Sequence, residues 1–192
     1  MAYVFESPIE TILSETLVFC GLKVNNQVEI PPYRVDMVVS NRDNRKVIIE
    51  CDGKEYHHWV VDDFRDDELW MTSRLPICHI KGEHIVQSPE NCAVAIINHF
   101  FPGNIDTVGY MQCVDIATKK IKEVPIGHQS VLWVYEPSSQ EKKRRDKIRQ
   151  STNRQSIYEL ARLYIVEDTE GWEEEREEQL KELDEFIKLR NS

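Results

Sequence analysis

The sequence lacks long apolar runs, closely paired cysteines and an overall positive charge. A membrane-spanning helix needs about 18 or more consecutive apolar residues, and the sequence has no such run and no basic-then-apolar secretion signal. The five cysteines form no Cys-x-x-Cys pair, so a disulfide framework is not expected. The spacing of Cys51, His57, His58, Cys78 and His79 matches no closed zinc site. These absences favour a cytoplasmic protein without membrane contact and with reduced thiols.

The net charge of −10 argues against a nucleic-acid partner, but the charge is unevenly distributed. Residues 167–192 contain eleven acidic and four basic residues, which leaves a net of −3 for the rest of the chain. Residues 142–149 (KKRRDKIR) hold six bases and one acid. This basic segment is a candidate DNA contact through Lys142, Lys143, Arg144 and Arg145, or it pairs with the acidic terminal helix.

The first hundred residues alternate between helical and strand patterns, which predicts an α/β fold. The expected order is helix, strand, strand, helix, strand, helix, over residues 7–20, 33–39, 46–52, 62–74, 77–80 and 88–101. Ser7, Pro8 and Glu10 form a capping-box pattern at the start of the first helix. We therefore expect residues 1–103 to form one α/β core.

Beyond Gly103 the patterns predict strands at 110–119 and 131–136, followed by helices at 138–166 and 172–189. Residues 104–137 would add strands that extend the core or pack on it, and residues 138–192 would form a helical extension, basic and then acidic. The last helix carries a narrow apolar stripe of Trp172, Leu180, Leu183 and Ile187. That stripe either packs on its own domain or binds a partner, such as a second copy in a homodimer.

The two central strands bring three carboxylates together. In a hairpin centred on Asp43, paired residues have numbers that sum to 86, so Asp36 lies opposite Glu50. Side chains alternate between the two faces of a strand, so Asp52 lies on the same face as Glu50. Such acids either lie on a solvated face or bind a hard cation such as Mg²⁺ or Mn²⁺. The unbroken run Val47–Ile49 indicates a strand covered on both faces, which favours the cation.

The segments YRVDMVVS, KVIIECDGKEYHH and DDFRDDEL resemble the very-short-patch-repair-like branch of the PD-(D/E)xK, or restriction-endonuclease-like, nuclease superfamily. The resemblance covers about residues 5–100. It implies a mixed sheet flanked by helices and a metal-dependent DNA endonuclease or nickase, in which a metal-activated water hydrolyses the phosphodiester bond. The rival interpretation is a catalytically silent nuclease fold that acts through protein–protein contact.

The resemblance also implies roles for individual residues. Asp36, Glu50 and the Cys51 carbonyl would bind the metal, and Asp52 and Glu10 would complete or orient the site. Asp52 stands where the superfamily usually has a Lys, so another residue must transfer the proton. Lys54 and His57 are the two candidates, and His57 is the main one. Lys54 and Arg65 are candidate DNA contacts, although Arg65 can instead pair with Asp62 or Asp66 on its own helix. Several relatives carry a Gly after the second helix, where this chain reads Ser73-Arg74-Leu75-Pro76.

Overall fold

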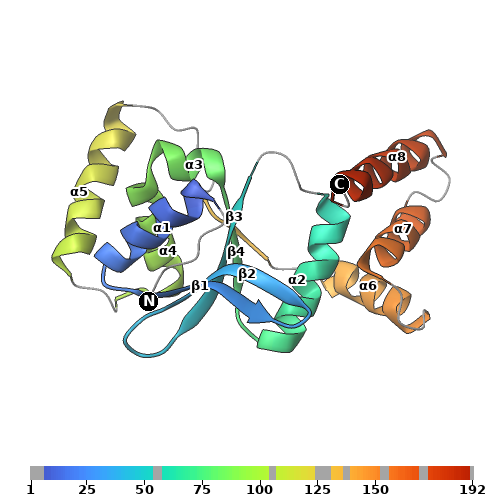
Figure 1. Cartoon of the computed structure of the whole chain (residues 1–192), viewed down its shortest axis with the longest axis horizontal. Helices are drawn as coiled ribbons and strands as arrows, with labels where there is room; N and C mark the ends of the chain where they lie inside the picture. Colours follow the sequence, from blue (N-terminus) through green and yellow to red (C-terminus); the bar gives the residue numbers. More distant parts are fainter. Residues whose placement is uncertain are drawn as a thin grey trace. The chain divides into compact units, whose positions relative to one another are not determined.

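The protein is a mixed α/β structure in which helices flank a five-stranded sheet (Figure 1). The computed structural model describes residues 7–53, 58–103, 107–123, 131–135, 139–151, 156–168 and 173–190. Its contacts divide the chain into two compact units, one of Met1–Gly53 and Thr72–Tyr135, the other of Lys54–Met71 and Glu136–Ser192. No helix within the described ranges is both long enough and apolar enough to span a bilayer.

The sheet belongs to the first unit, and its strands follow the order β1-β2-β3-β4-β5. The strands are β1 (Lys23–Ile30), β2 (Tyr33–Ser40), β3 (Lys46–Asp52), β4 (Ile77–Lys81) and β5 (Trp133–Val134). β3 and β4 are parallel, and the other neighbouring pairs are antiparallel. The sequence did not predict β1, because this edge strand (KVNNQVEI) is mostly polar and Asn26 interrupts the alternation of Val24, Val28 and Ile30.

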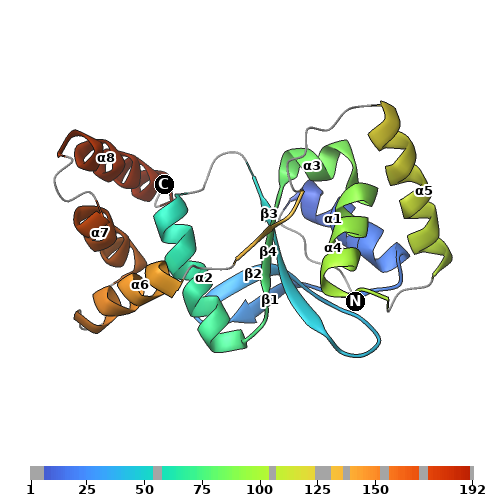
Figure 2. The ribbon, with the colours of Figure 1, turned by 180° about the vertical axis from the view of Figure 1, so that it is seen from behind.

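Four helices lie on one side of the sheet, and the last of them in the chain is the outermost (Figures 1 and 2). They are α1 (Pro8–Phe19), α3 (Gly82–Gln87), α4 (Pro89–Phe100) and α5 (Val108–Glu123). Their shared core with the sheet contains Leu13, Leu17, Met37, Val39, Val47, Ile49, Cys78, Ile80, Ile96 and Ile97. The central strand residue Ile48 is also fully buried, so β3 is covered on both faces, as its unbroken apolar run predicted.

Helix α5 replaces the strand that was predicted over residues 110–119, and that prediction was wrong. The β-branched and aromatic residues of the segment suggested a strand, but Gly109, Cys113 and Ala117 are buried at helical spacing. A Cβ on Gly109 would lie 2.0 Å from the Phe19 carbonyl oxygen, so the small residue lets α5 lie directly against the end of α1. The strand predicted over residues 131–136 is present as the shorter β5.

The second unit consists of α2 (Trp59–Ser73, whose last two residues belong to the first unit), α6 (Ser139–Ser151), α7 (Ile157–Asp168) and α8 (Glu173–Arg190). The single helix expected over residues 138–166 is two helices, α6 and α7. Their core contains Val60, Phe64, Ile148, Leu160, Tyr164, Ile165, Leu183 and Phe186. Helix α2 therefore shares a core with the C-terminal helices, so the contacts do not follow the boundaries expected at residues 103 and 137. The apolar stripe of α8 packs within its own unit; Trp172 lies outside the described residues.

Arg74 ends α2 in the left-handed region, with φ 59°. An L residue is disfavoured there, whereas Gly adopts this conformation freely. Arg74 thus occupies a conformation that a Gly would adopt more readily. The strand that follows, β4, starts at Ile77 as predicted.

Candidate functional site

The β2–β3 hairpin has the register that the sequence predicted. Met37 pairs with Ile49 and Val38 with Ile48, so each pair of numbers sums to 86, and the next position places Asp36 beside Glu50. The backbone N–H of Cys51 donates to Asp36 Oδ2 at 2.7 Å, and the N–H of Asp36 makes a longer contact of 3.5 Å with Glu50 Oε2. The Asp36 carboxylate is thus hydrogen-bonded to the backbone of β3, and the Glu50 carboxylate lies near the backbone of β2.

Asp52 lies on the same face of β3 as Glu50, because Ile49 and Cys51 alternate with them and pack against the core. In the parallel β3–β4 pair, Glu50 is opposite His79 and Asp52 is opposite Lys81. Asp52 Oδ1 lies 3.0 Å from Nδ1 of His79, and His79 is only 5% exposed. His79 therefore orients the Asp52 carboxylate toward β4, a contact that the sequence-based interpretation did not include.

Glu10 is buried on α1 and is bound by two polar side chains. Ser7 Oγ donates to its Oε1 at 2.9 Å, and Gln27 Nε2 donates to its Oε2 at 2.7 Å. Gln27 has φ 51° and stands at the interruption of the β1–β2 pairing, where the register would place it opposite Asp36. A non-glycine residue in this conformation is uncommon and often marks a functional position. No pattern in the sequence distinguished Gln27.

The four acids predicted for the site all act electrostatically on the Cys51 thiol. Burial, followed by the negative charges of Asp36, Glu10, Glu50 and Asp52, raises the pKa of Cys51 well above its usual value. Acids from α1, β2 and β3 are therefore close enough to act electrostatically on a single group. Cys51 remains a neutral thiol, so the Cys51 contribution expected at a metal site is its backbone carbonyl.

The donor set fits Mg²⁺ better than Zn²⁺. Mg²⁺ is commonly held by one or two carboxylates while waters and substrate phosphates fill its remaining positions. In such a site Asp36 and Glu50 would supply two carboxylates, and the Cys51 carbonyl would be a third oxygen. In the part of the chain that is described, no group of three or more His, Cys, Asp or Glu side chains is arranged to hold a metal ion.

Two other residues expected at the site, Lys54 and His57, lie outside the described residues. His58 belongs to the second unit, where its buried ring packs 5.8 Å from the ring of Phe186. Arg65 Nη1 lies 3.9 Å from Asp66 Oδ1, which is the pairing on its own helix that the sequence left open.

The expectation that Arg145 contacts DNA is wrong, because its guanidinium is buried in the second unit. Arg145 is 2% exposed and binds Asp67 Oδ2 through Nε at 2.7 Å and Asp63 Oδ2 through Nη1 at 3.0 Å. Asp63 and Asp67 are four residues apart and so share one face of α2. The acidic partner of Arg145 is thus α2, not the terminal helix that the sequence suggested.

The rest of the basic segment is more accessible. Lys143 is exposed, and Arg144 is half-buried with its guanidinium 5.0 Å from the centre of the Tyr164 ring. The side chain of Lys142 lies outside the described residues. Among the members of the predicted set whose side chains are described, Lys143 is therefore the exposed one.

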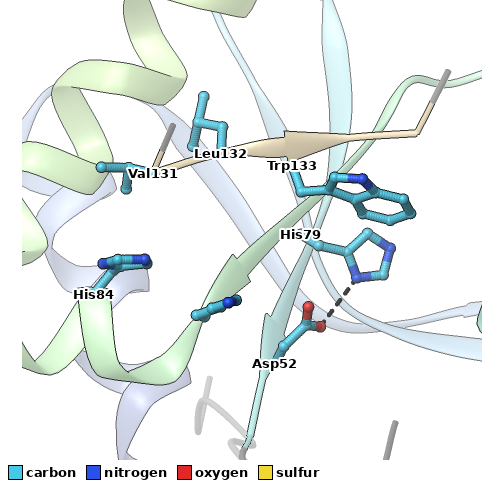
Figure 3. Close-up of a pocket in the computed structure, with 7 residues that line it drawn as sticks. Asp52, His79, His84, Val131, Leu132 and Trp133 are labelled. Carbon is cyan, nitrogen blue, oxygen red and sulfur yellow. Dashed lines mark hydrogen bonds and ion pairs between the residues drawn. The ribbon is translucent and has the colours of Figure 1, made fainter. Parts of the chain in front are cut away.

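A pocket of about 490 Å³ lies beside Asp52 (Figure 3). It is lined by Asp52, His79, Lys81, His84 and residues 131–133. The rings of His79 and Trp133 meet edge to face, with their centres 4.8 Å apart. Sequence reasoning missed this pocket, because its two walls are about fifty residues apart in the chain.

No protein-family model, no curated protein and no solved structure matches the chain.

Proposed function

We propose that the chain is a metal-dependent endonuclease or nickase that hydrolyses phosphodiester bonds in DNA on a restriction-endonuclease-like core. The observation that carries the proposal is the position of Asp36 beside Glu50 across β2 and β3, where the Cys51 N–H donates to Asp36 Oδ2 at 2.7 Å and the Asp36 N–H lies 3.5 Å from Glu50 Oε2. Glu10 and Asp52 act on the same thiol as these two acids, which supports one shared acidic site.

In this proposal Asp36 and Glu50 bind Mg²⁺ together with the Cys51 carbonyl. The bound metal would lower the pKa of a water and neutralise charge on the phosphate under attack. Glu50 is 6% exposed, and in such a poorly solvated position charge interactions are stronger than in water. The Cys51 N–H holds the Asp36 carboxylate in place, so little reorganisation is needed when a cation arrives.

Asp52 and Glu10 have orienting roles in the proposed mechanism. Asp52 is fixed by His79, which holds the end of β3 on which Glu50 lies. Glu10 is held by hydrogen bonds from Ser7, directly before α1, and from Gln27 on β1. Proton transfer is assigned to His57 or Lys54, which follow the Glu-Cys-Asp-Gly segment in the sequence.

Plasmid nicking tests the proposal. We expect wild-type protein to convert supercoiled plasmid to open circles in Mg²⁺ or Mn²⁺ but not in EDTA. Glu50→Gln and Asp36→Asn should lower the rate by about a hundredfold or more, since changes even to outer-shell partners of a metal cost about 10- to 100-fold. Glu29→Gln is the matched control, because it neutralises an exposed carboxylate on the same sheet. A folded wild-type protein without metal-dependent nicking would favour the silent binding module.

A further inference from the structure

The pocket beside Asp52 combines three kinds of surface. Trp133 supplies a large aromatic ring that is 49% exposed, and Val131 and Leu132 add apolar side chains. Next to Trp133, His79 and Asp52 supply hydrogen-bonding groups, joined by the contact drawn in Figure 3. Lys81 places a cation at the same pocket. A volume of about 490 Å³ lies within the range of sites that hold small ligands or parts of larger ones.

These surfaces match the chemistry of an unpaired nucleobase with its phosphate. Bases stack on exposed aromatic rings whatever their sequence, and the carboxylate and imidazole can exchange hydrogen bonds with the edge of a base. A lysine ammonium attracts the adjoining phosphate. A base inside a duplex has both faces stacked and its pairing edge occupied, so only an unpaired or extruded base can enter.

The sheet register relates the pocket to the acidic site. Glu50 is opposite His79 and His79 is opposite Trp133, so the three residues form one row across β3, β4 and β5. Neighbouring strands are about 4.8 Å apart, which separates the backbones at Glu50 and Trp133 by roughly 10 Å. This separation suits a nucleotide whose phosphate lies near Asp36 and Glu50 while a neighbouring base occupies the pocket.

We propose that this pocket binds one unpaired base of a DNA strand, with the base stacked on Trp133 and its edge facing Asp52 and His79. The substrate class is then DNA with an unstacked nucleotide, either in a single-stranded segment or extruded from a strained duplex such as supercoiled plasmid. This inference rests on the proposed function, because it takes the row from Glu50 to Trp133 as the path of a DNA strand.

The test is equilibrium binding in EDTA, where no cleavage occurs, measured by fluorescence anisotropy. The labelled probes are a single-stranded oligothymidylate of twelve residues, an abasic deoxyribose-phosphate strand of the same length, and a twelve-base-pair duplex. We expect wild-type protein to bind oligothymidylate at least about fivefold more tightly than the abasic strand, the lower end of the effect of one stacked base. The duplex, which offers no unpaired base, should bind no more tightly than the abasic strand.

Variants of Trp133 test whether the preference for oligothymidylate over the abasic strand depends on this residue. Trp133→Ala should bind both single strands equally, whereas Trp133→Phe should keep part of the preference because it retains an aromatic face. Phe19→Ala is the matched control, since Phe19 is a similarly exposed aromatic residue (54%) of the same unit that does not line the pocket. Thermal melts of all variants check that the unit remains folded.

The outcomes separate this inference from the proposed nuclease. Equal binding of oligothymidylate and the abasic strand by wild-type protein, or an undiminished preference in folded Trp133→Ala, would overturn the base pocket even if the protein nicks plasmid in Mg²⁺. A preference that requires Trp133 supports the base pocket even if nicking fails, because the binding is measured without metal.

Discussion

The carboxylate of Asp36 accepts a hydrogen bond of 2.7 Å from the backbone N–H of Cys51 on the neighbouring strand. Cys51 stands between Glu50 and Asp52, so this bond ties the acid of β2 to the stretch of backbone that carries the two acids of β3. The bond uses one oxygen of the carboxylate. Charge and hydrogen bonding at Asp36 can therefore be changed separately.

Asp36→Asn should remove Mn²⁺ binding without a large loss of stability, because an amide oxygen can still accept the Cys51 N–H. Asp36→Ala should lose the metal and in addition lower the free energy of unfolding by about 1–3 kcal/mol, the cost of an unsatisfied buried donor. Calorimetric titration with Mn²⁺ and denaturation in urea measure the two effects. Mn²⁺ binding by Asp36→Asn with wild-type affinity would exclude Asp36 as a ligand.

Gly109→Ala should destabilise the first unit by about 3 kcal/mol or more, above the usual range for overpacking. Its Cβ would lie 2.0 Å from the Phe19 carbonyl oxygen, and backbone cannot move aside as a flexible side chain can. Gly53→Ala is the control, because a Cβ there meets no atom within 4 Å. Urea midpoints that are equal for the two variants would show that α5 does not lie against α1 in this way.

Arg145→Ala should lower the free energy of unfolding of the second unit by about 3–5 kcal/mol, because it leaves Asp67 buried without its shortest ion pair. Lys143→Ala, an exposed position on the same helix, should change stability by less than about 0.5 kcal/mol. Thermal denaturation of both variants provides the comparison. A tolerated Arg145→Ala would mean that the guanidinium is not buried among these acids.

The fold and site were predictable where the determinants are local. The hairpin register follows from the turn at residues 41–45, where Asn41 Oδ1 accepts the Arg45 N–H at 2.9 Å and Asn44 has φ 60°. Asn favours both features, so the sequence alone placed Asp36 beside Glu50. The alternation of β3 then placed Asp52 on the same face.

Features that depend on distant partners were not predictable in this way. A basic run is compatible with solvent, DNA or a buried ion pair, and only the position of α2 shows that Arg145 pairs with Asp63 and Asp67. Likewise, the composition of residues 110–119 suited a strand, and the close approach of Gly109 to Phe19 favours a helix. Burial against a partner outweighed the local preference in both cases.

The stability of the second unit should fall as the pH drops below about 6.5, partly through His58. Burial lowers the pKa of His58, although the nearby Asp62 and Glu182 act in the opposite direction. The folded state therefore binds a proton less readily than the unfolded state, so stability is full above the unfolded pKa and is lost as the pH falls. Urea denaturation at pH 7.5 and 5.5 should show a smaller loss for His58→Gln than for wild type. Equal losses would contradict the lowered pKa.

The exposed lysines of α6 should carry whatever DNA contact the basic segment makes, because Arg145 is committed to the core. Lys143 and Lys147 are both exposed on this helix. Each phosphate contact releases condensed counterions when DNA binds. The double variant Lys143→Ala, Lys147→Ala should therefore bind duplex DNA more weakly. If both lysines contact phosphate, the slope of log K against log salt concentration should become shallower by about 1.8. Neither residue belongs to the core of the second unit, so its melting temperature should be unchanged. Binding measured from 50 to 200 mM KCl with an unaltered slope would mean that α6 does not contact DNA, and Lys81 at the pocket would then be the cation to test next.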